Sequence, residues 1–261
     1  MRKNKFRLLP RMITGILFFS FLVYYALLVN KTTPTNQALD TNDNEIVSVP
    51  EVLQSEQTDN SSALSEPVPV QPDPVELPSK INLDVPFMSQ APLAVWDDLH
   101  EDACEEASFL MVKHFIDKTA ISSPSSFDAE INSMIDYEES SGYGPSITLQ
   151  DLAVIAKTKY NLLGEIRTAT ISNLKTELAA GRPIIVGAAG KILPNPNFRN
   201  GGPNYHMLVI KGYNSTEFIT DDPGTRKGHN FVYTYDDLIN AIHNWNPENI
   251  LNGTREYLVF P

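Results

Sequence analysis

The chain has 261 residues, 42% of them hydrophobic, which is enough for one globular domain of ordinary size together with additional segments. Its formal net charge of −12 argues against a nucleic-acid partner, because phosphate binding requires a basic face. Cys104 is the one cysteine in the chain, so an intramolecular disulfide and a Cys-rich zinc cluster are excluded. The sequence implies no metal and no organic cofactor.

Residues 1–30 combine a basic start with an apolar stretch. They carry five basic groups and no acid, and residues 12–29 form an uncharged run of 18 residues. At about 1.5 Å per residue, this run is long enough to cross a hydrocarbon core of about 30 Å. Basic residues before such a run predict a cytoplasmic N-terminus, so that the rest of the chain is extracytoplasmic. We predict a single-pass transmembrane signal anchor in the cell membrane over residues 1–30; a cleaved signal peptide remains the alternative.

Residues 31–80 have the composition of a linker. They hold nine acids, two lysines, seven prolines and no aromatic residue. A segment of this kind cannot bury enough apolar surface to offset the entropy lost on ordering. We therefore predict a disordered, acidic, Pro-rich linker over residues 31–80, followed by a folded domain over residues 81–261.

The folded part begins with helices and continues with strands. Apolar residues at helical spacing predict helices over residues 104–118, from near Ser125 to before Gly142, over 148–160 and over 172–180. Ser125 with Asp128 and Thr148 with Asp151 fit helix-capping pairs. Strands are predicted over residues 183–188, 205–213, 217–220, 230–233 and 256–260, with one more helix over about 235–244. This order predicts an α+β domain in which a helical half packs on a mostly antiparallel sheet.

Three residues have positions that suit thiol hydrolysis. Cys104 begins the most apolar helix, where unpaired N–H groups and the helix dipole favour a thiolate. His206 lies in the first strand after a Gly-Gly-Pro-Asn turn, and Asp222 follows the next strand. Adjacent antiparallel strands would bring His206 and Asp222 together, with Asp221 as the alternative orienting residue.

Gln90 precedes Cys104 by fourteen residues and offers a side-chain amide that would complement the backbone N–H at the head of the helix in stabilising an oxyanion. The acids Asp97, Asp98, Glu101 and Asp102 lack the spacing of a calcium loop, and we interpret them as a solvated acidic loop. Residues 190–204, rich in Gly, Pro and Asn, form a long loop that we expect to border the substrate cleft.

Several segments in the same order resemble the C39-like cysteine peptidases, which are papain-like in fold: VPFMSQAP, then Trp96, ACEEASFLMV, YHMLVIKGY and FITDDPGT. The resemblance covers residues 81–261 and implies a Cys–His–Asp triad of Cys104, His206 and Asp222, with Gln90 shaping the oxyanion hole. Many members of the family have Gly-Pro after the cysteine, whereas Glu105 and Glu106 follow it here. If these carboxylates do not point to water, like-charge repulsion raises the pKa of the thiol.

The resulting hypothesis is a membrane-anchored, extracytoplasmic cysteine peptidase or amide hydrolase that acts on peptides or on peptide cross-links of the cell envelope. The alternative hypothesis is a catalytically inactive binding module that keeps the same fold. The acidic pair after Cys104 is the feature that motivates this alternative.

Overall fold

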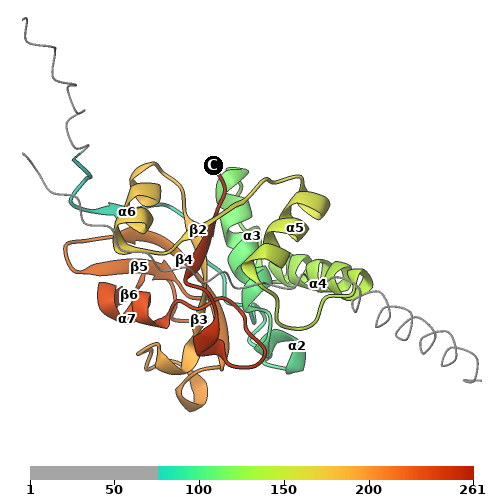
Figure 1. Ribbon diagram of the computed structural model, residues 1–261. Helices are drawn as coiled ribbons and strands as arrows, with labels where there is room; N and C mark the ends of the chain where they lie inside the picture. The colour runs from blue at the N-terminus through green and yellow to red at the C-terminus, as the bar shows by residue number, and fades with distance from the viewer. Residues whose placement is uncertain (1–75) are drawn as a thin grey trace, which may run out of the picture. The chain divides into compact units, whose positions relative to one another are not determined.

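A computed structural model describes residues 76–261 (Figure 1). The predicted anchor over residues 1–30 and most of the predicted linker lie outside the described residues. Across residues 76–261, no helix combines the length and the apolar character that a bilayer-spanning segment requires.

The first half of the described chain is helical. It contains α2 (Asp98–Glu101), α3 (Cys104–Ile116), α4 (Pro124–Ser141) and α5 (Leu149–Tyr160). Residues 104–112 of α3 are all buried, which explains why its apolar residues spread beyond one stripe. The acidic segment interpreted as a loop forms the short helix α2, so that interpretation was wrong in part.

Helix caps decide where α4 and α5 begin. The α5 helix begins after Thr148, whose side chain pairs with Asp151 as predicted. The α4 helix begins after Ser123 and not near Ser125, because Ser123 and Ser126 form the capping box and Pro124 takes the first helical position.

The second half supplies most of the sheet. The strands of the sheet are β1 (Ile81–Asn82), which lies before the helices in the chain, and β2 (Glu165–Thr168), β3 (Ile184–Ala189), β4 (Tyr205–Tyr213), β5 (Glu217–Asp221), β6 (Phe231–Thr234) and β7 (Glu256–Val259). The strand order is β2-β7-β3-β4-β5-β6, with β1 paired to β4, and every pairing is antiparallel. Two further helices, α6 (Ile171–Ala179) and α7 (Tyr235–Ala241), lie between strands in the chain.

Helices cover both faces of the sheet, as Figure 1 shows for α3, α4 and α5 on one side and α6 and α7 on the other. Side chains of β4 alternate between the two faces: Met207 and Val209 pack in the core with α3, and Leu208 and Ile210 pack in the core with α6 and α7. This arrangement confirms the predicted α+β class with an antiparallel sheet. It also places the start of α3 against the first residues of β4, where the candidate site lies.

Candidate active site

Cys104 is the first residue of α3, and its thiol is held by two short contacts. Its Sγ donates a hydrogen bond to Oε2 of Glu105 at 2.8 Å and accepts one from the backbone N–H of Met207 at 3.3 Å. The side chain is buried, and within residues 76–261 its sulfur forms no hydrogen bond with His206. The helix therefore places the thiol against β4, next to the backbone of His206, while the thiol proton points to Glu105.

The surroundings of Cys104 hold its thiol in the protonated form. Burial raises the pKa of the thiol well above its ordinary value, and the charge and the hydrogen-bonded carboxyl of Glu105 raise it further, against the opposite effect of the Met207 N–H. Burial also raises the pKa of Glu105 to about 8. Glu105 and Glu106 are both buried, so neither carboxyl points to water, and the charge of each raises the pKa of the thiol.

His206 and Asp222 form a buried pair. His206 Nε2 lies 2.8 Å from Oδ1 of Asp222, which also accepts a hydrogen bond from the Gly224 N–H at 3.0 Å. The other carboxylate oxygen, Oδ2, accepts from the Tyr233 hydroxyl at 2.7 Å and from Asn195 Nδ2 at 3.1 Å. Burial by itself would raise the pKa of Asp222, but these donors, His206 first among them, bring it below its ordinary value.

This hydrogen bonding assigns the tautomer of the imidazole. Because Asp222 is an ionised acceptor, Nε2 of His206 carries a proton and donates it to the carboxylate. The lone pair of the neutral ring is then on Nδ1, which is the atom able to take a proton from a nucleophile.

The ring of His206 is fixed by packing as well as by Asp222. Phe198 meets it edge-on, with ring centroids 5.2 Å apart. A Cβ at Gly224 would lie only 2.7 Å from Cε1 of His206, so the backbone of Gly224 approaches the ring as no residue with a side chain could.

Asp221 faces a different partner. Its Oδ1 accepts hydrogen bonds from Nδ1 of His229 at 2.9 Å and from the backbone N–H of Asn230 at 3.1 Å. Of the two aspartates that the sequence left open, Asp222 is thus the one that contacts His206.

Gln90 does not present a free donor. Its backbone N–H donates to the carbonyl of Pro223, and its Nε2 donates to the carbonyls of His100 at 2.9 Å and Glu101 at 3.0 Å. Both amide hydrogens are therefore engaged by α2, and the oxyanion role expected for Gln90 requires that one of these bonds be released. The role stays a prediction.

A pocket of about 630 Å³ opens beside His206. Gln90 and Trp96 line it, together with Phe198 and six other residues of the loop 190–204, which confirms that this loop borders the pocket containing His206. Four cations line the pocket: Lys191, Arg199, Arg226 and Lys227. One acid, Glu101, lines it as well and forms an ion pair with Arg199 at 2.9 Å. Cys104 does not line this pocket.

Two members of the site, Asn195 and Tyr233, were not predicted from the sequence. Both hold the carboxylate of Asp222, yet Asn195 lies in the loop 190–204 and Tyr233 in β6, with no motif that links either to Asp222. The one available signal is the alternation of β6, which turns Tyr233 toward the core of the domain.

Comparison with known proteins identifies the family. The chain matches the family model of the Peptidase_C39 like family over residues 82–249. It belongs to this family.

Two solved structures are similar to this member of the family. One is a protein named as a C39-like peptidase from Bacillus anthracis, with 15% identity and a TM-score of 0.47; the match covers 70% of this chain and 98% of that one. The other is xylellain, a cysteine protease from Xylella fastidiosa, with 16% identity and a TM-score of 0.35, covering 71% of this chain and 86% of that one. No curated protein matches the chain. The family assignment rests on the family model.

Proposed function

We propose that this chain is a cysteine peptidase that hydrolyses amide bonds of peptides with Cys104 as nucleophile, His206 as base and acid, and Asp222 as the residue that orients His206. One observation carries the proposal: the buried His206–Asp222 pair adjoins Met207, whose N–H contacts the Cys104 sulfur. Membership of the Peptidase_C39 like family supports it.

The proposed reaction begins when the Cys104 side chain turns from Glu105 toward Nδ1 of His206. The imidazole takes the thiol proton, and the thiolate attacks the carbonyl carbon of the substrate amide. The imidazolium then gives its proton to the leaving amine, which leaves a thioester on Cys104. Water, deprotonated by His206, hydrolyses the thioester and regenerates the thiol.

Asp222 acts in this sequence through the imidazole. Its carboxylate holds the Nε2 proton at 2.8 Å and stabilises the positive charge that His206 acquires. The oxyanion forms next to the first N–H groups of α3, which have no partner within a helix. Gln90 joins them if it releases a carbonyl of α2.

A cleavage assay tests the proposal. The full-length chain is incubated with a mixture of synthetic peptides under reducing conditions, and the products are identified by mass spectrometry. We expect new peptide termini with the wild-type chain and none with Cys104→Ser or His206→Ala. A folded wild-type chain that yields no product, or a Cys104→Ser variant that yields the same products, would contradict the proposal.

A second candidate function is a peptide-binding module without turnover. The hydrogen bond from the thiol to Glu105 and the raised pKa of that thiol favour it. It predicts that Cys104→Ala binds peptides as the wild-type chain does and that neither protein cleaves them. The same peptide mixture, analysed for binding and for products, separates the two functions.

We further propose that the peptidase is anchored in the cell membrane by residues 1–30, with its N-terminus in the cytoplasm and its catalytic part outside, where peptides of the cell envelope are its substrates. The basic and apolar pattern of residues 1–30 supports this location. Mass spectrometry of the native N-terminus shows whether the segment is retained. Protease added to intact cells should digest the folded part, and protection of that part would contradict the location.

A further inference from the structure

The pocket of about 630 Å³ that contains His206, which we call the His206 pocket, has an excess of positive charge. Four cations and one acid line it, and the acid, Glu101, is already paired with Arg199. The described part of the chain has the opposite balance, because residues 76–261 contain 14 Lys and Arg residues against 24 Asp and Glu residues. Cations are therefore concentrated at the pocket that holds the proposed catalytic base.

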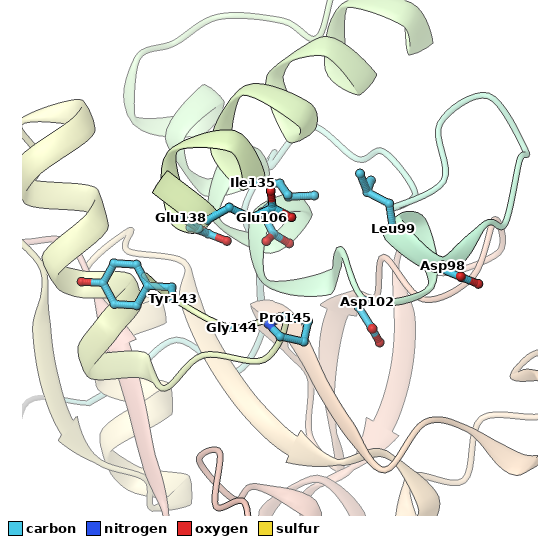
Figure 2. A pocket seen from close by; sticks show the side chains of 10 residues that line it. Asp98, Leu99, Asp102, Glu106, Ile135, Glu138, Tyr143, Gly144 and Pro145 are labelled. Carbon is cyan, nitrogen blue, oxygen red and sulfur yellow. The ribbon is translucent and has the colours of Figure 1, made fainter. Parts of the chain in front are cut away.

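A second pocket, of about 360 Å³, has the opposite charge. Figure 2 shows Asp98, Asp102, Glu106 and Glu138 among its lining residues, and no lysine, arginine or histidine lines it. Residues of α2 line both pockets. The positive charge is therefore a local property of the His206 pocket and not of the surrounding surface.

Two of the cations, Lys191 and Arg199, come from the loop 190–204. Arg199 directly follows Phe198, whose ring meets the imidazole edge-on. The ammonium group of Lys191 donates a hydrogen bond to a backbone carbonyl of the same loop at 3.1 Å, and the guanidinium group of Arg199 pairs with Glu101 at 2.9 Å. These contacts hold both side chains at the pocket.

The other two cations, Arg226 and Lys227, come from the turn between β5 and β6. The backbone N–H of Gly228 donates to the carbonyl of Thr225 at 3.2 Å, and the N–H of Lys227 donates to Thr225 Oγ1 at 3.1 Å. In the same turn Gly224 packs against the imidazole, where an added Cβ would lie 2.7 Å from Cε1 of the ring. The hydrogen bonds thus fix the backbone that carries both cations beside the imidazole.

The side chains of Arg226 and Lys227 are available to a ligand. Both are exposed, and within residues 76–261 neither forms a hydrogen bond or an ion pair. Like charges that gather in one place repel each other, and an anion that binds among them removes this repulsion. Guanidinium and ammonium groups bind carboxylates through charge-assisted hydrogen bonds. In a peptide, aspartate and glutamate side chains and the C-terminus supply such carboxylates.

We propose that the His206 pocket binds carboxylate groups of a peptide, so that peptides with acidic residues are the preferred substrates. This inference rests on the proposed peptidase function for the substrate class, but binding in the pocket does not require turnover. A peptide segment held there lies beside His206, the group proposed to protonate the leaving amine. The net charge of −12 repels an acidic peptide from the chain as a whole, so the attraction comes from the cations of the pocket.

A binding experiment tests the inference without catalysis. The full-length chain carrying Cys104→Ala is titrated at low ionic strength with alanine-based octapeptides that contain three consecutive glutamates or three consecutive glutamines at the start, the middle or the end. Each peptide is made with a free and with an amidated C-terminus, which distinguishes the terminal carboxylate from side-chain carboxylates.

We expect a placement at which the amidated glutamate peptide binds about tenfold more tightly than the amidated glutamine peptide. Each exposed ion pair contributes a factor of up to roughly five, so two or three pairs are sufficient. Sodium chloride at about 0.5 M should reduce this difference severalfold, because salt screens exposed charges.

Two double variants locate the preference. Arg226→Gln with Lys227→Gln, combined with Cys104→Ala, should lower the preference for glutamate severalfold. The two cations are exposed and their side chains have no partners within residues 76–261, so the variant should fold. Lys157→Gln with Arg255→Gln is the matched control, because it removes the same charges from exposed residues that do not line the pocket, and it should keep the preference.

The outcomes separate this inference from the proposed function. Equal affinity for all peptides, no binding of any peptide, a preference that Arg226→Gln with Lys227→Gln leaves unchanged, or an equal loss in the matched control would overturn the inference. Cleavage of peptides by the wild-type chain, together with equal affinity in the binding experiment, would overturn it and leave the peptidase function standing. Carboxylate-selective binding without cleavage of any peptide would support the inference and contradict the peptidase function.

Discussion

A substitution of the buried residue Asp222 distinguishes an active peptidase from an inactive binding module with the same fold. Replacing Asp222 with Asn keeps its shape and removes its charge. An amide whose oxygen takes the place of Oδ1 keeps the bonds from His206 and Gly224. Its NH₂ group then faces two donors, the Tyr233 hydroxyl and Asn195 Nδ2.

Two hydrogen bonds to a charged acceptor are lost, each with a contribution of about 1.5–3 kcal/mol. The Tyr233 hydroxyl can turn and accept from the new amide, so we expect the free energy of unfolding to fall by about 3 kcal/mol, at the low end of the range for breaking a buried ion pair. The neutral amide also fails to stabilise the imidazolium of His206. We therefore expect kcat/KM to fall by about 10²-fold or more, within the usual contribution of acid–base catalysis.

Hydrolysis of a cleaved peptide gives kcat/KM, and urea denaturation followed by Trp fluorescence gives the free energy of unfolding. Asp221→Asn is the matched control, because Asp221 is equally buried and adjacent but contacts His229 and Asn230 instead of His206. It should keep kcat/KM near the wild-type value. An Asp222→Asn chain with wild-type activity, or an equal loss in Asp221→Asn, would refute the assignment of Asp222.

Three other predictions concern the thiol, the buried acids and the imidazole. Above pH 8 the ionised Glu105 opposes the thiolate, so the Cys104 thiol should be alkylated faster in Glu105→Gln than in the wild-type chain at pH 9. The control Glu248→Gln, at an exposed acid, should react at the wild-type rate. Equal alkylation rates for Glu105→Gln and the wild-type chain would refute this prediction. Because the folded pKa of Glu105 is raised to about 8, the folded state holds more protons than the unfolded state between about pH 4.5 and 8. Its stability should fall as pH rises through that window, by up to about 1.4 kcal/mol per pH unit for this group, and urea denaturation of Glu105→Gln should show a flatter profile. Gly224→Ala should displace the His206 ring and reduce peptide hydrolysis by at least about tenfold. The control Gly144→Ala, where an added Cβ meets nothing within 4 Å, should keep the wild-type rate of hydrolysis. Retained activity in Gly224→Ala would contradict the packing argument.

Long elements with clear signals were predictable from the sequence. The bounds of β4 were predicted to the residue, since its run of apolar residues lies between a Gly-Gly-Pro-Asn turn and Asn214. The start of α5 followed from the side chains of Thr148 and Asp151. In contrast, α2, β1 and β2 were not predicted, because α2 and β2 each contain a single apolar residue and β1 is only two residues long, so none of them shows an apolar pattern.

The candidate site, too, was predictable from the sequence only in part. Hairpin order was sufficient to bring His206 and Asp222 together, because the strand that holds His206 and the strand before Asp222 are neighbours. The direction of the thiol was not predictable, since it depends on whether Glu105 is buried beside it or turned to water. The engagement of both Gln90 amide hydrogens by α2 was also beyond reach, because α2 itself was not predicted.

Covalent trapping is the most direct test of Cys104 as a nucleophile activated by His206. The full-length chain is treated near neutral pH with a peptidyl fluoromethyl ketone, and the adduct is located by mass spectrometry. We expect a single adduct on Cys104 in the wild-type chain and in Asp221→Asn, with labelling strongly reduced in His206→Ala and Asp222→Asn. Equal labelling of the wild-type and His206→Ala chains, or no adduct on a folded wild-type chain, would show that Cys104 is not a nucleophile activated by this pair.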